Sequence, residues 1–124
     1  MTAHLDIDVA RNLVTLELRD RLGLDQAAAV LADLIADGRL RPGPNGLIDT
    51  TELDGLDLRA HDVRHLASIA ERADALWEGG RWAVVAPRDL VYGMACMYQL
   101  IRSGAPYEIE VFRTKEDALR WLAL

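Results

Sequence analysis

The sequence predicts a mixed α/β domain in which helices cover a five-stranded sheet. Two observations favour this class. The chain starts with two short runs of alternating apolar and polar residues, the pattern of half-buried strands. Three later apolar runs are each followed by a segment with apolar residues at helical spacing, the pattern of parallel strands joined by right-handed crossovers. The predicted order is therefore ββαβαβαβα, in a single domain over residues 1–124.

The N-terminal strands are predicted to form a hairpin. His4–Val9 alternates between apolar and polar residues, and Leu13–Leu18 does so again after a turn at residues 10–12. So short a connection requires antiparallel pairing. Asp25 is then expected to cap a helix that ends near Gly38.

The rest of the chain alternates strands with helices. The segment 39–46 holds two prolines and two glycines, so it is a surface connection. The segment 50–58 is expected to be a loop. Thr114 and Asp117 resemble a capping box. The predicted elements are a strand at Leu47–Asp49, a helix from Ala60 to Trp77, a strand at Trp82–Ala86, a helix at Asp89–Ser103, a strand at Ile109–Phe112 and a helix from Lys115 onward.

Composition is that of an ordinary globular protein, with 51% hydrophobic and 27% charged residues. The net charge is −6 and the basic residues are scattered, which argues against nucleic-acid binding. One cysteine excludes an internal disulfide framework and suits a reducing compartment. No basic start precedes an apolar run, and no run approaches the ~20 apolar residues of a spanning helix. We therefore expect a cytoplasmic protein without integral membrane association.

Two groups of residues are of the types that ligate metals. His61 and His65 stand four apart on a predicted helix, but no third ligand is evident and both fall opposite its apolar stripe. Four acids, Asp49, Glu52, Asp54 and Asp57, follow the third strand, where ligands bind in open α/β sheets. Their spacing is not that of a calcium loop, and aspartate also favours turns. We expect no metal and no cofactor.

Catalytic residues are not predicted either. Asp74 falls near the apolar stripe of its helix, and we expect an exposed helix end where the carboxylate reaches water or an arginine such as Arg72 or Arg81. Cys96 has no neighbouring cation to lower its pKa, so it is interpreted as a small hydrophobic residue. The sequence thus predicts a protein that is not an enzyme.

The predicted helix Asp89–Ser103 is apolar nearly all round. Four residues form the stripe expected to face the sheet: Leu90, Met94, Met97 and Ile101. The opposite face, with Tyr92, Ala95, Cys96 and Gln99, carries no charge until Arg102. A helix of this kind is covered on both sides. The cover could be the core itself, a second copy of the chain, or a lipid-like ligand.

A ligand or partner surface is predicted around this helix and the nearby strand edge. Tyr92, Cys96 and Gln99 are expected to point outward, and Met94 and Met97 toward the interior. The predicted surface comprises Asp49, Thr50, Thr51, Pro87, Tyr92, Met94, Cys96, Met97 and Gln99. Thr50 and Thr51 are also hydroxyls that could be phosphorylated.

Two segments resemble a known family. The order of elements, the segment RWAVVAPRDLVYGM from Arg81 and the ending VFRTKEDALRWL from Val111 resemble the SpoIIAA-like group of small bacterial proteins. That group is related to STAS domains, and its fold is compared with the CRAL-TRIO lipid-transfer fold. The resemblance covers most of the chain and implies a STAS/SpoIIAA-like sheet with an N-terminal hairpin.

The resemblance implies a function by binding. It favours a regulatory or protein-interaction module, which we expect to be a homodimer; the alternative is a carrier or sensor of a small hydrophobic, lipid-like ligand. In the antagonist branch of the family, a phosphorylated serine in an Asp-Ser-Ser-Gly motif opens the helix after the third strand. Here that stretch reads Asp57-Leu58-Arg59-Ala60, so only the aspartate matches and the phosphoserine is not available.

Overall fold

The computed structural model describes residues 2–123, which form one five-stranded sheet with helices on both faces. The strands are β1 (Thr2–Asp8), β2 (Leu13–Gly23), β3 (Asn45–Asp57), β4 (Arg81–Val85) and β5 (Glu108–Phe112). The helices are α1 (Leu24–Ile35), α2 (Ala60–Ala70), the 3₁₀ turn η1 (Glu71–Ala73), α3 (Asp74–Trp77), α4 (Asp89–Ile101) and α5 (Lys115–Leu122).

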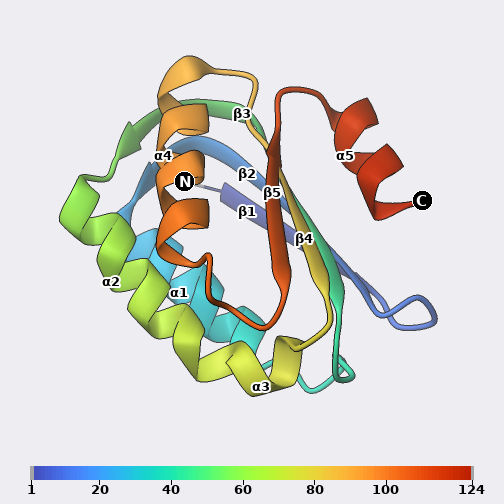
Figure 1. Cartoon of the computed structure of the whole chain (residues 1–124). Coiled ribbons are helices and arrows are strands. Elements are labelled where there is room, and N and C mark those ends of the chain that lie inside the picture. Colours follow the sequence, from blue (N-terminus) through green and yellow to red (C-terminus); the bar gives the residue numbers. More distant parts are fainter. Residues whose placement is uncertain (1, 124) are drawn as a thin grey trace.

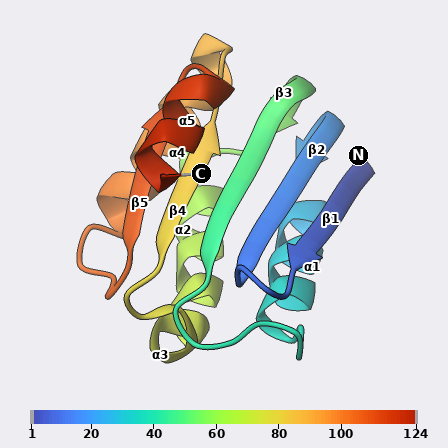
Figure 2. The same cartoon turned by 90° about the vertical axis from the view of Figure 1, so that its right-hand side faces the viewer.

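The strands lie in the sheet in the order of the sequence, β1-β2-β3-β4-β5 (Figure 2). β1 pairs antiparallel with β2, and the three later pairs are all parallel. The short turn between β1 and β2 requires antiparallel pairing, and the longer helical connections between the later strands allow parallel pairing. The predicted fold class and the predicted hairpin are confirmed.

Helices cover the two faces of the sheet unequally. α1, α2 and α4 lie on one face, and α5 alone lies on the other (Figure 1). On the α5 side, Leu47, Ala83 and Val85 pack against Ala118 and Leu122. β4 is therefore buried on both faces, which explains its unbroken apolar sequence.

β2 and β3 are longer than predicted. β3 continues to Asp57, so residues 50–57 are strand and not the loop expected from their aspartates and glycine. β2 continues alongside to Gly23, and the register shifts between Glu17 and Arg19 and again between Asp20 and Arg21. The extension places leucines of both strands over α1, and this burial outweighs the turn preference of the polar residues. The leucines of this cluster are Leu16, Leu18, Leu22 and Leu53.

Helix boundaries differ from the prediction in three places. α1 begins at Leu24, so Asp25 lies in the first turn and is not the cap; the Gln26 side chain accepts from the Gly23 N–H at 2.8 Å instead. α1 ends at Ile35, before Gly38. The helix predicted from residue 60 to 77 divides into α2, η1 and α3.

The C-terminal unit matches its prediction. The Thr114 hydroxyl accepts from the Asp117 N–H at 3.2 Å and caps α5. Trp121 holds α5 to the sheet, with its ring 5.6 Å from that of Phe112 and 4.3 Å from the Arg81 guanidinium. Among residues 2–123, no helix is long and apolar enough to cross a membrane.

Candidate functional site

An apolar cavity lies between the sheet and the three helices on its helical face. Its volume is about 220 Å³, and eight elements contribute to its wall: β2, α1, β3, α2, α3, β4, α4 and β5. From α4, the helix that we expected to be covered on both sides, Met94, Ala95 and Tyr98 line the space. An engineered apolar cavity of about 150 Å³ stays dry and binds benzene, so this space is large enough for a small apolar molecule.

Few polar atoms belong to the wall of the cavity. The Thr50 hydroxyl donates to the Val85 carbonyl at 2.6 Å, so it is already satisfied. The Tyr107 hydroxyl accepts from an Arg102 N–H at 3.3 Å. Trp82 is 4% exposed, and its Nε1 is buried without a hydrogen-bond partner.

The indole of Trp82 is held in a fixed place by Gly46, its register partner on β3. A Cβ at Gly46 would stand 2.1 Å from Cε3 and 2.3 Å from Cζ3 of the indole, so only glycine allows this approach. Trp77 covers the indole, with the two ring centroids 4.7 Å apart. The tryptophan is therefore rigid, and its N–H is a fixed donor.

A buried ion pair stands behind the cavity wall. Arg102, whose side chain is 5% exposed, donates to Asp74, and Glu71 lies 3.8 Å away. The guanidinium also stands 5.7 Å from the centroid of the Tyr107 ring. We expected Asp74 to reach water or Arg72 or Arg81; its partner is instead Arg102, the residue that follows α4. These contacts join the end of α4 to η1 and α3.

Burial changes the ionisation of this region. Burial raises the pKa of Tyr98. The neighbouring Tyr107 raises this pKa further, and the positive charge of Arg102 lowers it. Burial also raises the pKa of Tyr107, although its hydrogen bond with Arg102 opposes this. For Arg102, burial lowers the pKa, but the hydrogen bond to Tyr107 and the acidic groups nearby, among them the Asp74 carboxylate, raise it overall. Both phenols thus stay protonated at neutral pH, and the guanidinium stays charged.

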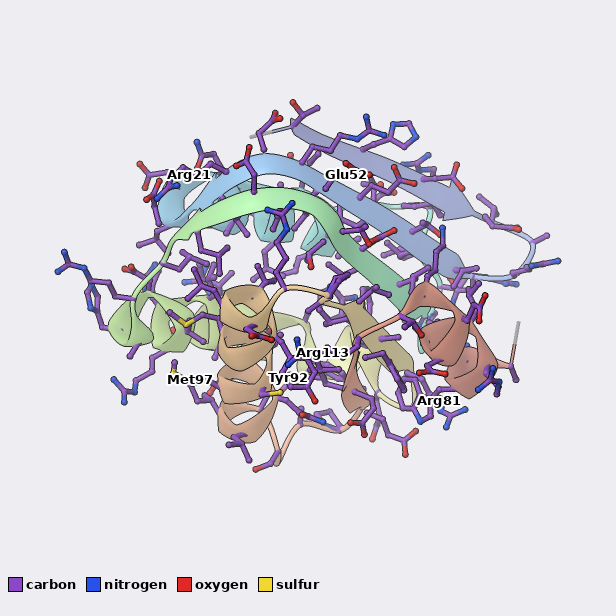
Figure 3. All side chains as sticks on the ribbon, turned by 90° about the horizontal axis from the view of Figure 1, so that it is seen from above. Arg21, Glu52, Arg81, Tyr92, Met97 and Arg113 are labelled. Carbon is purple, nitrogen blue, oxygen red and sulfur yellow. The ribbon has the colours of Figure 1, made fainter. Side chains whose placement is uncertain are left out.

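The orientation predicted for α4 is wrong. The side facing the sheet carries Val91 and Ala95, which pack with Val111 of β5. Met97 lies away from the sheet, on a different side of α4 from Tyr92 (Figure 3). The outer side exposes Leu90 by 59%, Leu100 by 74% and Ile101 by 40%. The charge-free sequence gave no polar face from which to fix the rotation of the helix.

Tyr92, Cys96 and Gln99 do not point outward as predicted. Tyr92 and Cys96 pack on the cluster around Val111, and Gln99 donates to the Ile109 carbonyl at 2.8 Å. These three residues attach α4 to β5. Arg113 covers Tyr92, with its guanidinium 3.8 Å from the ring centroid (Figure 3).

The strand edge that was predicted as part of the binding surface borders a separate hollow of about 430 Å³. Asp49, Thr51 and Pro87 line this hollow. The Asp49 carboxylate accepts from the N–H of Thr51 at 2.9 Å and also from its hydroxyl. Thr50 is 5% exposed and lies on the other face, where it lines the apolar cavity and not this hollow. This corrects the prediction for Thr50, whose hydroxyl is not accessible for modification.

The candidate metal ligands are not brought together. His61 and His65 are exposed, and His61 lies 3.1 Å from Asp62. The four acids are spread along β3, and Asp57 accepts two hydrogen bonds of 2.7 Å from Arg21. Within residues 2–123 no group of three or more histidine, cysteine, aspartate or glutamate side chains is placed to hold a metal ion.

Sequence reasoning missed most of the cavity. Met94 was expected to point toward the interior, and it does line the space. Trp82 and Tyr98 were predicted only as parts of a buried strand and an apolar helix, because an aromatic residue in an apolar run is indistinguishable from ordinary core. The available signal was Tyr107, an aromatic residue in a polar loop, but it identifies no cavity by itself.

Comparisons with solved structures identify the fold. An uncharacterized protein of the DUF3478 family from Shewanella loihica, described as having a SpoIIAA-like fold, matches with a TM-score of 0.59 and 23% identity, over 98% of this chain and 92% of that chain. The anti-sigma factor antagonist SpoIIAA in its unphosphorylated form matches with a TM-score of 0.55 and 17% identity, over 98% of each chain. The phosphorylated form of the Bacillus cell fate determinant SpoIIAA matches with a TM-score of 0.51 and 18% identity, over 98% and 99%.

The chain therefore has a SpoIIAA-like fold, as the sequence resemblance implied. No protein-family model matches the chain, and no curated protein matches it in sequence.

Proposed function

We propose that this protein is a non-enzymatic binding module, a sensor or carrier that takes up a small apolar ligand between α4 and the sheet. The observation that carries the proposal is the cavity of about 220 Å³ with its almost entirely apolar wall. The SpoIIAA-like fold supports a regulatory role, since SpoIIAA is itself an anti-sigma factor antagonist. Binding of the ligand would favour one conformation of the surrounding helices and so report its presence.

The wall of the cavity favours binding over catalysis. None of the described residues that line it is a carboxylate, histidine, lysine or cysteine. Three hydroxyl-bearing side chains line the cavity. The Thr50 hydroxyl already donates to the Val85 carbonyl, and burial raises the pKa of the phenols of Tyr98 and Tyr107. No general base therefore stands within reach of a molecule in this space.

The volume limits the size of the ligand. Pockets for drug-sized ligands measure about 300–1,000 Å³, and this cavity is smaller. It exceeds the cavity of about 150 Å³ that binds benzene. We therefore propose a compact ligand, close to an alkylbenzene or a short acyl chain in size, and not a long-chain fatty acid.

Isopropylbenzene is the probe that tests the proposal. Chemical denaturation of the purified protein is followed at increasing concentrations of isopropylbenzene. At ten times its dissociation constant, a ligand specific to the folded state raises the free energy of unfolding by about 1.4 kcal/mol. The midpoint should therefore rise with the concentration of isopropylbenzene, in proportion to its logarithm once the concentration exceeds the dissociation constant.

Palmitate and the variant Ala95→Leu are the controls. Palmitate should leave the midpoint unchanged, because it does not fit. Ala95 lines the cavity, so a leucine there should remove the effect of isopropylbenzene. A midpoint that does not change with isopropylbenzene in the unaltered protein contradicts the proposal.

A second candidate function is self-association through the outer side of α4. Leu90, Gly93, Met97 and Leu100 are spaced as the apolar seam of a helix pair. The two leucines, Leu90 and Leu100, are 59% and 74% exposed. A second copy would cover this seam, with Gly93 allowing close approach, since nothing lies within 4 Å of a Cβ placed there. This supports the homodimer expected from the sequence, but on different residues.

Leu100→Glu tests the second candidate. Sedimentation should show a dimer for the unaltered protein and a monomer for Leu100→Glu, with unchanged circular dichroism because Leu100 is exposed. Ser103→Glu, an exposed change just past the end of α4, is the matched control and should leave the dimer intact. A monomeric unaltered protein rules out this candidate and leaves the cavity proposal untouched.

A further inference from the structure

The outer edge of β5 carries backbone groups that no other strand pairs with. β5 is the last strand of the sheet, and only β4 is paired with it. On the β4 side, the Glu108 N–H donates to the Gly80 carbonyl at 3.0 Å. The Phe112 carbonyl accepts from the Ala86 N–H at 2.7 Å on the same side. Because the direction of these groups alternates along a strand, the N–H and carbonyl of Ile109 point away from β4.

A side chain of α4 already occupies part of this edge. The Gln99 amide nitrogen donates to the Ile109 carbonyl at 2.8 Å, on the side of β5 that faces away from β4. The same nitrogen lies 3.2 Å from a Glu110 carboxylate oxygen. Gln99 therefore lies where the N–H of an added strand would lie. Within residues 2–123, the Ile109 N–H makes no hydrogen bond.

The edge lies in a hollow that has a wall on each side. α4 lies on one side of β5 and α5 on the other (Figure 1). This β5 hollow measures about 810 Å³, and its lining includes Gln99, Leu100, Ile109, Glu110 and Trp121. A peptide that adds to the edge would thus be held by side chains as well as by its backbone, the usual arrangement for strand addition.

The charges of the β5 hollow favour a basic peptide. Glu108 is already paired with Arg81 at 2.9 Å, and Arg102, whose guanidinium is buried, is paired with Asp74. Glu110 is half-buried and forms no ion pair with any described residue. A cation on the added strand would supply the missing partner.

The two walls favour an alternating pattern in that strand. Glu110 shares the α5 face of the sheet with Phe112, whose ring contacts Trp121. A lysine that faces α5 can lay its stem on the indole and bring its ammonium to Glu110. The neighbouring residues of the strand face α4, where Leu100 is 74% exposed, and aliphatic side chains suit that position.

A second copy of β5 fits this edge poorly. Symmetric antiparallel pairing centred on Glu110 would place the two Glu110 carboxylates directly opposite each other. Pairing centred on Ile109 would place Glu108 opposite Glu110. Like charges in such positions destabilise a sheet.

We infer that the β5 edge binds a short extended segment of another protein, in which basic and aliphatic residues alternate, as an added strand of the sheet. An N–H of the segment replaces the Gln99 amide at the Ile109 carbonyl, and one of its carbonyls accepts from the Ile109 N–H. The surface lies on the outer edge of β5, so the inference does not rest on the proposed function of the cavity.

The peptide Val-Lys-Val-Lys-Val, with both ends blocked, is the probe. Amide hydrogen exchange of the unaltered protein is followed by nuclear magnetic resonance with and without this peptide. At about ten times the dissociation constant, exchange of the Ile109 N–H should slow about tenfold, because only the unbound protein exchanges it. The amides of β1, the strand at the opposite edge of the sheet, should exchange as before.

Two peptides and two variants are the controls. Val-Glu-Val-Glu-Val has the wrong charge and Val-Lys-Pro-Lys-Val cannot pair as a strand, so neither should protect Ile109. Glu110→Lys should weaken binding of the lysine peptide about fivefold, since an attractive cross-strand pair becomes a repulsive one. Glu52→Lys makes the same change of charge on an exposed residue of β3 outside the β5 hollow, and should leave the affinity nearly unchanged.

Three outcomes would overturn the inference and leave the cavity proposal untouched. The first is an Ile109 N–H that the lysine peptide does not protect. The second is equal protection of the β1 amides, which would mean that the β5 hollow selects nothing. The third is protection of Ile109 that rises with protein concentration in the absence of peptide, which would identify a second copy as the occupant.

Discussion

Filling the cavity with a side chain should stabilise the protein and abolish ligand binding. At about 24 cal/mol per Å³ of enclosed cavity, a partly open space of about 220 Å³ corresponds to a loss of less than about 5 kcal/mol. Ala95→Leu adds three carbon atoms to the α4 wall of this space. At about 0.8 kcal/mol for each buried carbon, the largest gain is about 2.4 kcal/mol. Imperfect fit reduces this, so we expect a gain of about 1–2 kcal/mol in the free energy of unfolding.

Urea denaturation and a thermal melt measure this gain. A gain of 1–2 kcal/mol raises the melting temperature by roughly 4–8 °C for a chain of this length. Ala32→Leu is the matched control, because Ala32 is an alanine on the exposed side of α1. It accounts for the effect of leucine on helix formation and should leave stability nearly unchanged.

One result would refute the reasoning. In a well-packed interior, an added leucine forces its neighbours apart and costs about 1–3 kcal/mol. Destabilisation of Ala95→Leu by that amount, with Ala32→Leu unchanged, would mean that the space between α4 and the sheet is already filled. The proposed function would then lose its supporting observation.

Three further predictions concern stability. Gly46→Ala should destabilise the protein by more than about 2 kcal/mol in urea denaturation, because its Cβ would overlap the Trp82 ring. Asp74→Asn should cost about 3 kcal/mol, since it leaves the buried Arg102 guanidinium without its close partner; in an Arg102→Met background the same change should cost far less. Burial raises the pKa of Tyr98 above 10.0, so the unfolded chain releases the phenol proton first and stability falls as pH rises beyond about 10, by up to about 1.4 kcal/mol per pH unit for one such group. Tyr98→Phe should make that fall less steep in denaturation series between about pH 8 and 11, and an unchanged slope would contradict the burial of its hydroxyl.

Much of the fold could be predicted from the sequence because hydrophobic periodicity reports burial directly. Alternation in residues 4–9 and 13–18 indicated the hairpin, and Thr114 with Asp117 indicated the start of α5. The extension of β3 could not be predicted, because residues 50–57 contain three aspartates or glutamates and a glycine. Only the pairing with β2 and the packing of Leu53 on α1 make that segment a strand.

The candidate site was predicted less well, for a physical reason. On a helix without charges, periodicity cannot distinguish the buried side from the exposed side, and the rotation of α4 was therefore wrong for Met97, Tyr92, Cys96 and Gln99. The rotation is set by particular contacts. Gln99 is bonded to the β5 backbone, and Arg102 is bonded to Asp74.

The cavity could not be predicted at all, because an unfilled space is a property of packing and not of any residue. Its wall is drawn from residues between Leu16 and Ile109, so no local pattern reveals it. The free N–H of Trp82 is equally invisible in the sequence, where a tryptophan in an apolar run indicates only a buried strand.

Crystals of the protein pressurised with xenon test the central claim most directly. Xenon enters apolar cavities of this kind and is located by its anomalous scattering. The account predicts a xenon site between α4 and the sheet, in contact with Met94 and Ala95, that is absent from Ala95→Leu crystals. Xenon-treated crystals with no site in this space would contradict the account.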